Sequence, residues 1–213
     1  MWDKARNFWV PVMTPYTYDY PRPSVTTDVV LVAPGPPAPR VLLIRRRSDP
    51  FRGQWALPGG FLEMDEELDA CARRELLEET GIEVGPLLEL GAYGTVGRDP
   101  RGRTISVVYL ALAAFELPAI VAGDDASDAA WHPLDRLPRL AFDHADILAH
   151  AKARLEVLAR TPGGLTPLLP DSATLADLRR VEAWLAAREK GKGGANPGAK
   201  KKTLSRVTSV RKA

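Results

Sequence analysis

Cysteine and histidine are scarce in this sequence of 213 residues. Cys71 is the single cysteine, so an intramolecular disulfide and a cysteine-based zinc site are both excluded. The three histidines, His132, His144 and His150, form no metal-ligand spacing with one another, and we expect each to be a surface or helix-cap residue. We expect Cys71 to be a small packing side chain. A reducing, cytoplasmic setting is the default prediction for such a chain.

Long apolar runs are also missing. No run approaches the ~18–20 residues of a membrane span. The first residues are polar and aromatic, where a secretory signal would have an apolar segment. We therefore expect no membrane association. The hydrophobic content of 45% is nevertheless enough to bury a core.

Acidic residues are absent from Lys190 to Ala213, a stretch that holds eight Lys or Arg residues. The first 189 residues carry 21 basic and 27 acidic groups, so an acidic body is followed by a strongly basic tail. Its Gly/Lys-rich composition predicts disorder. A tail of this charge can bind nucleic acid nonspecifically, with steep salt dependence.

The rest of the chain is organised around residues 60–82, which we expect to form a Gly-Gly turn and then one amphipathic helix closed by Gly81. Glu75, Glu78 and Glu79 are spaced i, i+3 and i+4, so their carboxylates project from one helical face. Like charges at this spacing repel, but converging oxygen ligands suit a hard divalent cation such as Mg²⁺. Arg74 can hold one carboxylate in a fixed orientation. The alternative is a solvated acidic helix face.

Strand and helix patterns alternate along the chain and predict an α/β fold with a mixed sheet and helices on its faces. The expected strands are Thr26–Val32, Arg40–Arg46, a short extended piece at 55–60, Ile82–Thr95, Arg103–Ala113 and Ala129–His132. Asp143 is expected to cap a helix that runs to about Arg160, and a last helix is expected to begin at Ser172 or Thr174. By composition the chain divides into an aromatic and proline-rich arm (1–23), a main domain (24–160), a linker with the last helix (161–190) and the basic tail (191–213).

The residues from Gly60 to Ile82 match the pattern G-x5-E-x7-R-E-U-x-E-E-x-G-U at every position, U being a bulky aliphatic residue. This pattern resembles the box of the Nudix hydrolases. The resemblance implies an α/β/α sandwich over roughly residues 24–160 and hydrolysis of a nucleoside diphosphate linked to another moiety. It also implies Mg²⁺ or Mn²⁺ as the cofactor and a small-molecule nucleotide as the substrate.

The resemblance assigns roles residue by residue. Metal ligation falls on Glu75, Glu78, Glu79 and the backbone carbonyl of Gly59. The position of Arg74 orients these carboxylates, and the position of Glu66 supports the metal-water network. Some family members use an acid on a later loop as the base, for which Asp124, Asp125 and Asp128 are candidates and Asp125 is our choice. An ordinary solvated loop is the alternative for these three.

The sequence around the box resembles the ADP-ribose pyrophosphatase branch of the family, in the segments 46–61, 97–103, 124–126 and 141–144. That branch usually carries a proline about fifteen residues past the box, where this chain has Val96, with Pro100 a little later. Arg52, Arg98 and Arg101 offer forked cations for a second phosphate or a ribose. The alternative for each is a solvated side chain. Trp55 is expected in the core.

Two alternative functions remain open. Regulators in the same branch sense ADP-ribose with a Nudix domain and bind DNA with a winged helix, and residues 168–178 resemble the segment that enters that second domain. The chain beyond this segment is short and Gly/Lys-rich, so we expect no winged helix. The other alternative is cleansing of oxidised nucleoside triphosphates. The aromatic arm and the family both favour a homodimer.

Overall fold

The structure is a computed structural model, and it describes residues 2–3, 8–9, 18–34, 39–113, 120, 126–170 and 179. The basic tail, Asp124, Asp125 and, apart from residue 179, the predicted last helix lie outside these residues. No helix in the described ranges is long and apolar enough to cross a bilayer.

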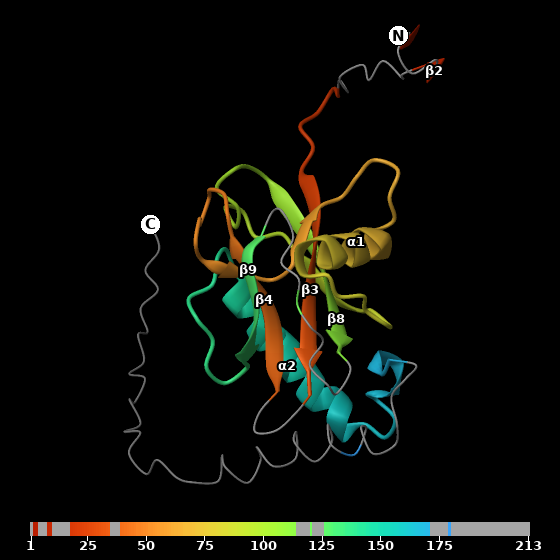
Figure 1. The fold of residues 1–213 in the computed structure, drawn as a ribbon, viewed down its shortest axis with the longest axis vertical. Helices are drawn as coiled ribbons and strands as arrows, with labels where there is room; N and C mark the ends of the chain where they lie inside the picture. The colour runs from red at the N-terminus through yellow and green to blue at the C-terminus, as the bar shows by residue number, and fades with distance from the viewer. Residues whose placement is uncertain are drawn as a thin grey trace, which may run out of the picture.

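The described chain contains seven strands of one sheet, two α-helices and a short 3-10 helix (Figure 1). In chain order these are β3 (Ser24–Ala33), β4 (Arg40–Arg46), β5 (Trp55–Ala56), β6 (Gly59–Phe61), α1 (Leu68–Thr80), β7 (Leu88–Tyr93), β8 (Thr104–Leu112), β9 (Ala126–Pro133), α2 (His144–Arg160) and η1 (Thr166–Leu168). Two short strands precede them, β1 (Trp2–Asp3) and β2 (Phe8–Trp9), which pair antiparallel with each other.

The sheet is mixed, as the sequence predicted. Its strand order is β5-β4-β3-β8-β7, with β6 also paired to β3 and β9 to β4. The central strands β3 and β8 run parallel from the pair Ser24–Thr104 to the pair Val32–Leu112, and the other pairs are antiparallel.

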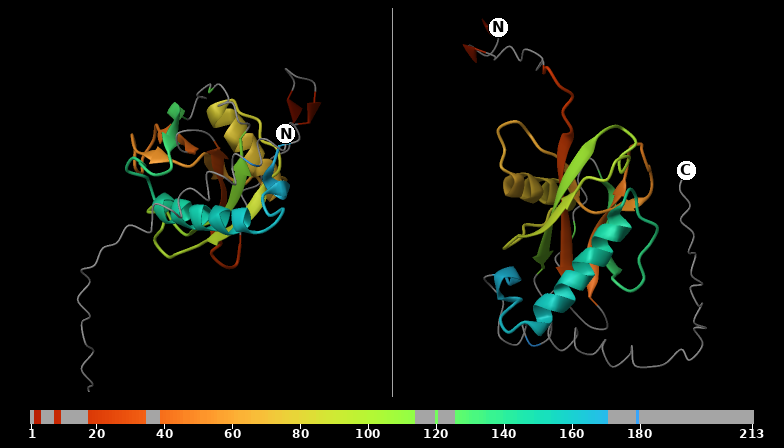
Figure 2. Two further views of the ribbon diagram at one scale, coloured as in Figure 1. Left: turned by 90° about the horizontal axis from the view of Figure 1, so that it is seen from below. Right: turned by 180° about the vertical axis from the view of Figure 1, so that it is seen from behind.

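Alternate residues of the central strands supply two separate cores, one on each face of the sheet. Val30 and Val32 of β3 pack with the buried side of α2, whereas Val29 and Leu31 pack with that of α1. Side chains of a strand point alternately to its two faces, so a continuous apolar run such as that of β3 indicates burial on both. The two helices lie on opposite faces (Figure 2), which makes the domain the α/β/α sandwich that was predicted.

The helix α1 ends where the sequence indicated. Gly81 has a left-handed φ of 69°, and its N–H donates to the carbonyl oxygen of Leu77. The predicted Gly-Gly turn was wrong, because Gly59 and Gly60 belong to β6, and the helix itself begins at Leu68. Gly60 pairs with Thr27 of β3, so this backbone is held by the sheet rather than by a turn.

The edge of β3 is shared between two strands. β4 pairs with β3 only at Val32 and Ala33, and β6 pairs with the other end of β3, at Thr26–Asp28. The strands β4 and β6 therefore occupy different stretches of this edge. Thr26 and Asp28, in the N-terminal half of β3, line the cleft that forms the candidate active site.

Other predicted elements differ mainly in length. The strand expected over Ile82–Thr95 is confined to β7, because residues 82–87 form no ladder. α2 runs to Arg160, as predicted, and it buries an apolar stripe at Ile147, Leu148, Ala151 and Leu155. Beyond it, Leu165 and Leu168 are fully buried in the same core, so residues 161–170 pack on the domain.

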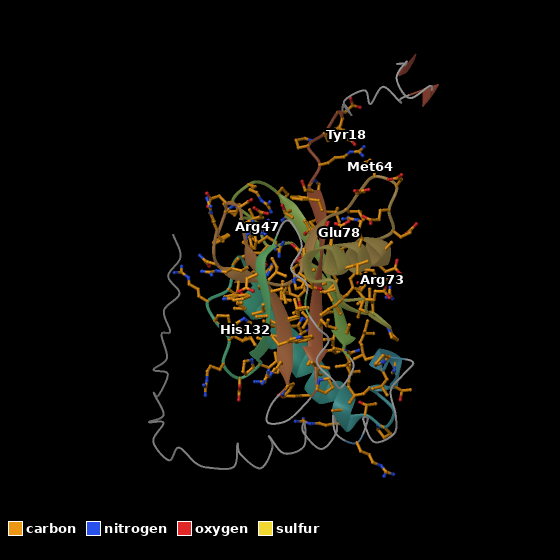
Figure 3. The ribbon with its side chains drawn as sticks, in the orientation of Figure 1. Tyr18, Arg47, Met64, Arg73, Glu78 and His132 are labelled. Atoms are coloured by element: carbon orange, nitrogen blue, oxygen red, sulfur yellow. The ribbon has the colours of Figure 1, made fainter. Side chains whose placement is uncertain are left out.

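Residues 18–23, the described part of the aromatic arm next to β3, extend away from the domain (Figure 3). Tyr20 is 81% exposed and Tyr18 is 39% exposed, with the guanidinium of Arg22 stacked 3.7 Å from the Tyr18 ring. These rings do not pack into the domain. Their burial against a second subunit stays a prediction.

Candidate active site

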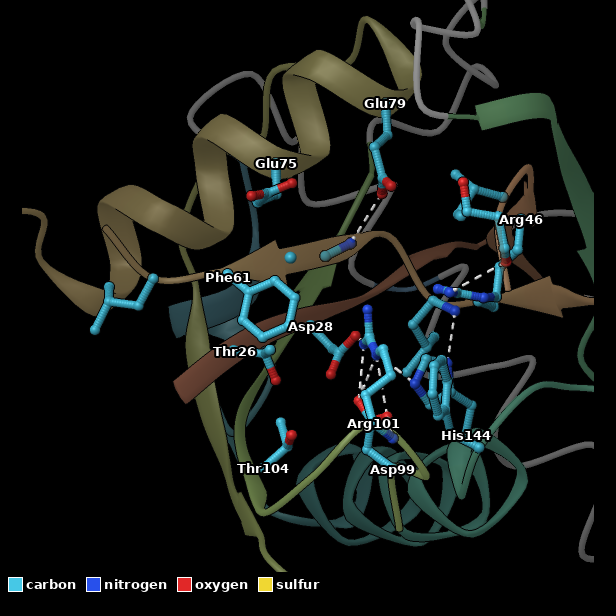
Figure 4. Close-up of a pocket in the computed structure, with 18 of the residues that line it drawn as sticks. Thr26, Asp28, Arg46, Phe61, Glu75, Glu79, Asp99, Arg101, Thr104 and His144 are labelled. Atoms are coloured by element: carbon cyan, nitrogen blue, oxygen red, sulfur yellow. Dashed lines mark hydrogen bonds and ion pairs between the residues drawn. The ribbon is translucent and has the colours of Figure 1, made fainter. Parts of the chain in front are cut away.

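A cleft of about 420 Å³ lies beside α1, at the end of the sheet where β3 begins. Its walls come from distant parts of the chain: β3, β4, β6, α1, the segment 98–104 and the start of α2 (Figure 4). The segments 46–61, 97–103 and 141–144, which were singled out beside the box, all contribute to it.

Two of the three helix carboxylates face this cleft. Glu75 and Glu79 line it, and Glu79 is buried, with only 8% exposed. The Glu79 carboxylate accepts a hydrogen bond of 2.9 Å from the backbone N–H of Gly59. Glu78 does not line the cleft; its side chain is 59% exposed and contacts Arg74 at 3.2 Å.

Both glycines of β6 are required by close contacts. Gly59 has a φ of +154°, and a Cβ there would lie 2.1 Å from the carbonyl oxygen of Thr27. A Cβ on Gly60 would lie 2.4 Å from the Glu75 carboxylate, which therefore packs directly over the backbone of β6. The pair of glycines thus lets α1 bring its carboxylates against the sheet.

Arg74 binds the acids around it. Its guanidinium donates to both carboxylate oxygens of Glu66, at 2.8 and 2.9 Å, and to Glu75 at 2.8 Å. The hydrogen bonds from Arg74 hold the pKa of Glu66 at about 2. Burial raises the pKa of Glu75, and the hydrogen bond from Arg74 opposes that rise. Arg74 therefore links Glu66, which precedes α1, to a carboxylate of the cleft.

The donor set matches a hard cation in its chemistry. The carboxylates of Glu75 and Glu79 and the backbone of Gly59 offer only oxygen ligands on the cleft wall, as Mg²⁺ prefers. In the described part of the chain, no three His, Cys, Asp or Glu side chains already form a metal-binding group. Glu78 is the one member of the predicted ligand set that is turned away from the cleft.

The floor of the cleft holds polar residues that the sequence prediction missed. Thr26 and Asp28 come from β3, and Thr104 comes from the start of β8. All three are buried, and Asp28 accepts a hydrogen bond from Ser106, which is fully buried. The sequence does carry a pattern that indicates these residues. Thr26, Thr27 and Asp28 are polar side chains near the start of an otherwise apolar strand.

The prediction for His144 was wrong. It opens α2, but it is buried and lines the cleft rather than the surface. Its Nδ1 accepts a 2.9 Å hydrogen bond from the backbone N–H of Leu57, and its Nε2 lies 3.7 Å from Asp28. Burial lowers the pKa of His144, which favours the neutral ring.

Arg98 and Arg101 both line the cleft and are both paired with acids. Arg98 is buried and binds Asp143 through two hydrogen bonds, of 2.9 and 2.6 Å. Asp143 is the N-cap residue of α2, as predicted, but its side chain binds Arg98 and makes no cap hydrogen bond. Arg101 is 42% exposed and binds Asp99. Burial would raise the pKa of Asp99, but the hydrogen bonds from Arg101 outweigh it and lower the pKa.

Aromatic rings and arginines alternate at the mouth of the cleft. The Arg101 guanidinium lies 5.1 Å from the ring of Phe61 and 5.8 Å from that of Phe142. The Arg46 guanidinium also lies over the Phe142 ring, at 4.8 Å. Phe142 has a φ of 52°, which costs of order 1 kcal/mol for a residue with a side chain. Phe61 is 47% exposed, so the cleft has an open aromatic surface beside cations.

The remaining predicted residues lie elsewhere. Arg52 is exposed and does not line the cleft. Asp125, the chosen base, is outside the described residues, and Asp128 is exposed. His150 is exposed and contacts Tyr93 at 2.6 Å.

Trp55 has the packing role that was predicted. It is partly buried against the core on the α2 side and stacks edge-on with His132, with 4.4 Å between ring centroids. His132 is itself partly buried, and its Nε2 has no hydrogen-bond partner, so it too departs from the predicted surface position.

The NUDIX domain family model matches residues 22–151, more than half of the chain. The chain belongs to the Nudix family. The resemblance seen in residues 60–82 is therefore confirmed. An ADP-ribose pyrophosphatase of Methanocaldococcus jannaschii is 42% identical over 130 residues, which cover 61% of this chain and 73% of that protein.

Two further comparisons are with a transcriptional repressor and with the NUDIX domain of NrtR. The "ADPR responsive transcriptional repressor NtrR" of Acinetobacter baylyi is 38% identical over 168 residues, covering 76% of this Nudix chain and 66% of the repressor. The NUDIX domain of Shewanella oneidensis NrtR, solved with ADP ribose, superposes with a TM-score of 0.60 at 34% identity, covering 64% of this chain and 90% of that domain. Together with the pyrophosphatase, these relatives confirm the predicted branch and support a Nudix pyrophosphohydrolase.

Proposed function

We propose that this Nudix protein hydrolyses ADP-ribose to AMP and ribose 5-phosphate with Mg²⁺ or Mn²⁺. The observation that carries the proposal is the convergence of Glu75, Glu79 and the backbone of Gly59 on one wall of a cleft of about 420 Å³. The proposed metal ligands are those three groups together with Glu78.

The carboxylates on this wall favour a cation-mediated reaction. A diphosphate carries negative charge and would be repelled by two bare carboxylates at contact distance. A divalent cation between them neutralises charge that develops on the bridging oxygen and lowers the pKa of a bound water. An acidic wall without a cation would be a poor site for any nucleotide.

The protein's own groups would hold this wall in place. Arg74 fixes Glu75 through a 2.8 Å hydrogen bond and is itself fixed by both oxygens of Glu66. The N–H of Gly59 fixes Glu79. Such supporting contacts keep ligands in position before the substrate arrives, which is where much of the rate enhancement of an enzyme originates.

The opposite side of the cleft is suited to the rest of the nucleotide. Arg101, flanked by Phe61 and Phe142, presents a cation between two aromatic rings. Guanidinium groups bind phosphate oxygens in a forked geometry, and aromatic rings stack on bases. Arg52 and Arg98 stay predicted substrate ligands, although Arg98 would have to keep or exchange its pairing with Asp143.

The general base is proposed to be an acid near the cleft. Asp125 is the candidate taken from the sequence. Glu79 is the alternative in the described part of the site, because it is buried, faces the cleft and is held by a backbone N–H. The variant Asp125→Asn separates the two candidates: it should lower kcat without weakening cation binding if Asp125 is the base, and it should leave kcat unchanged if Glu79 is the base.

A second function is favoured by one observation, the repressor relative that responds to ADP-ribose. In that role the cleft would bind ADP-ribose and leave it intact. The Glu75 and Glu79 carboxylates argue for the enzyme, because a site that only binds a diphosphate gains nothing from like charge beside it. Nonspecific nucleic-acid contact by the basic tail and formation of a homodimer remain predictions.

A substrate panel with product identification separates these functions. ADP-ribose, NADH, diadenosine polyphosphates and oxidised dGTP are incubated with the protein and Mg²⁺, and the products are separated by chromatography. AMP released from ADP-ribose supports the proposal, and pyrophosphate released from oxidised dGTP would identify a triphosphate-cleansing enzyme. Glu79→Gln should abolish turnover, whereas the matched change Glu89→Gln, on an exposed residue of β7, should leave it unchanged. Tight binding of ADP-ribose without turnover by the wild type would refute the enzyme.

A further inference from the structure

Asp28 occupies a distinctive place beside the wall that carries the helix carboxylates. It lies opposite Gly59 in the register of β3 and β6. A Cβ on Gly59 would lie 2.9 Å from Oδ1 of Asp28, so this carboxylate touches the backbone whose N–H binds Glu79. Figure 4 shows Asp28 projecting into the cleft from below Phe61. A ligand group that contacts Asp28 is thus an immediate neighbour of the group held by the α1 wall.

The Asp28 carboxylate has unused hydrogen-bonding capacity. Ser106 donates to its Oδ2, whereas the ring nitrogen Nε2 of His144 is 3.7 Å from Oδ1, beyond hydrogen-bond distance. A carboxylate can accept about four hydrogen bonds. In the described part of the chain no Lys or Arg forms an ion pair with Asp28, and Arg98 acts on it only at longer range.

The other acid on this side of the cleft provides a contrast. Asp99 accepts hydrogen bonds from the backbone N–H and from the side chain of Arg101, which engage both of its oxygens. Both oxygens of Asp99 are therefore occupied by hydrogen bonds from Arg101, whereas Asp28 has no such arginine partner among the described residues. A buried carboxylate with few donors is costly, and a ligand that brings donors repays this cost.

The chemistry around Asp28 specifies what kind of group it would accept. The neighbouring polar groups of the cleft, Thr26 and Thr104, are hydroxyls. A phosphate would be repelled by the Asp28 charge, and an apolar group would leave the carboxylate unsatisfied. Two adjacent hydroxyl groups can donate one hydrogen bond to each oxygen of a carboxylate, which is also how acidic residues bind ribose in dinucleotide-binding domains.

His144 lies near this acceptor, with its Nε2 3.7 Å from Oδ1. Its Nδ1 accepts the backbone N–H of Leu57, so in the neutral ring the proton is on Nε2, the nitrogen that faces Asp28. The N–H of the neutral ring, and not a nitrogen lone pair, therefore faces Oδ1 of Asp28. Ser106 thus engages Oδ2, and the Asp28 carboxylate keeps hydrogen-bonding capacity in the cleft that it lines.

We propose that Asp28 binds the vicinal diol of a ribose attached to the diphosphate and so selects ribose-containing substrates. This inference rests on the proposed function, which supplies the diphosphate beside the α1 wall. ADP-ribose contains two such diols, one on the adenosine side and one on the terminal ribose. The shared chemistry is a cis diol on a ribose whose C5 oxygen carries the phosphate.

The test compares three ligands: ADP-ribose, its 2′-deoxyadenosine analogue and its analogue with a 2-deoxy terminal ribose. Wild-type protein should lose at least about 100-fold in kcat/KM for one of the two analogues, because the missing hydroxyl leaves a polar site unsatisfied. The analogue that fails identifies which ribose Asp28 holds. Asp28→Asn should lose a similar factor on ADP-ribose and should treat that analogue and ADP-ribose within about 3-fold of each other.

Three measurements keep the outcome interpretable. Asp135→Asn makes the same chemical change on an exposed residue far from the cleft and should behave as wild type. Ser106→Ala, which removes the side-chain donor to Asp28, should reduce discrimination part of the way. Calorimetric binding of the three ligands repeats the comparison without turnover.

The two proposals fail in different ways. Discrimination in binding by the wild type, lost in Asp28→Asn and accompanied by no hydrolysis, would refute the enzyme and keep the diol site. Hydrolysis with equal rates for all three ligands would refute the diol site and keep the enzyme. A folded Asp28→Asn protein that is weakened equally on every ligand, with discrimination intact, would show that Asp28 has only a structural role.

Discussion

Gly60 offers a sharp test of how the helix wall is built, because its substitution should separate stability from activity. Its φ is not in the left-handed region, so alanine is compatible with the backbone. The new methyl group would, however, lie 2.4 Å from the Glu75 carboxylate, whereas ordinary contact begins at 3.4 Å. The carboxylate must therefore retreat by about 1 Å, away from the cleft wall.

The expected loss of activity results from that displacement. Misplacing a catalytic group by about 1 Å can cost about 100-fold in rate, or roughly 2.7 kcal/mol of transition-state stabilisation. Stability should change little, because the Glu75 carboxylate is the end of a flexible side chain. Weakening its hydrogen bond to Arg74 costs about 1 kcal/mol, and replacing glycine in a strand regains roughly 0.5–1 kcal/mol. The unfolding temperature should thus stay within about 4 °C.

Steady-state kinetics on ADP-ribose and a thermal melt measure the two quantities. Gly102→Ala is the matched control, because a Cβ there meets nothing within 4 Å and its activity should be unchanged. In a background of Glu75→Ala the methyl group has no carboxylate to displace, so the double variant should be no worse than Glu75→Ala alone. Wild-type activity in Gly60→Ala, or a further large loss in the double variant, would refute the reasoning.

Three more outcomes test other parts of the account. Arg74→Lys removes the fork that binds Glu66 and Glu75, and kcat should fall by about 10- to 100-fold with little change in melting temperature; an unchanged kcat would contradict the orienting role. Because burial lowers the pKa of His144 below 6.5, the unfolded chain binds more protons there than the native chain, so the urea midpoint should decrease as the pH drops below 6.5. His144→Asn should flatten that dependence, and an equally steep curve would assign it to another group. Leu168→Ala should lower the free energy of unfolding by about 2–5 kcal/mol in urea titrations, and a negligible loss would exclude residues 161–170 from the core.

Local patterns in the sequence predicted much of the fold. The apolar run of β3 marked a strand, which the structure shows to be buried on both faces, and the buried stripe of α2 follows helical period. Gly81 marked the end of α1 because a left-handed residue there ends a helix. Each of these features is decided by neighbours within a few residues, which is why a sequence pattern can reveal it.

The errors concern interactions between distant residues. His144 was placed on the surface because its partner, the N–H of Leu57, lies 87 residues earlier in the chain. Asp143 is the N-cap residue of α2, but its carboxylate binds Arg98, 45 residues earlier in the chain, and makes no cap hydrogen bond. Gly60 was placed in a turn because its pairing with β3 is a tertiary contact.

The candidate site was predicted in part for the same reason. The helix spacing identified Glu75 and Glu79, which both face the cleft, but it gave equal weight to Glu78, which is turned toward solvent. A helix face is broad, and only the position of β6 decides which of its carboxylates reach the cleft. Asp28 was missed because nothing in β3 alone shows that β6, the segment 98–104 and the start of α2 enclose a cleft around it.

The central claim is that this protein cleaves the diphosphate of ADP-ribose by attack of water at phosphorus, with a divalent cation held by Glu75 and Glu79. The most direct measurement is mass spectrometry of the products formed from ADP-ribose in ¹⁸O-labelled water with Mg²⁺. We expect AMP and ribose 5-phosphate, one of them carrying a single ¹⁸O on its phosphate, and no products after chelation of the cation. Recovery of intact ADP-ribose, or products that form without a cation or without label on phosphorus, would contradict the claim.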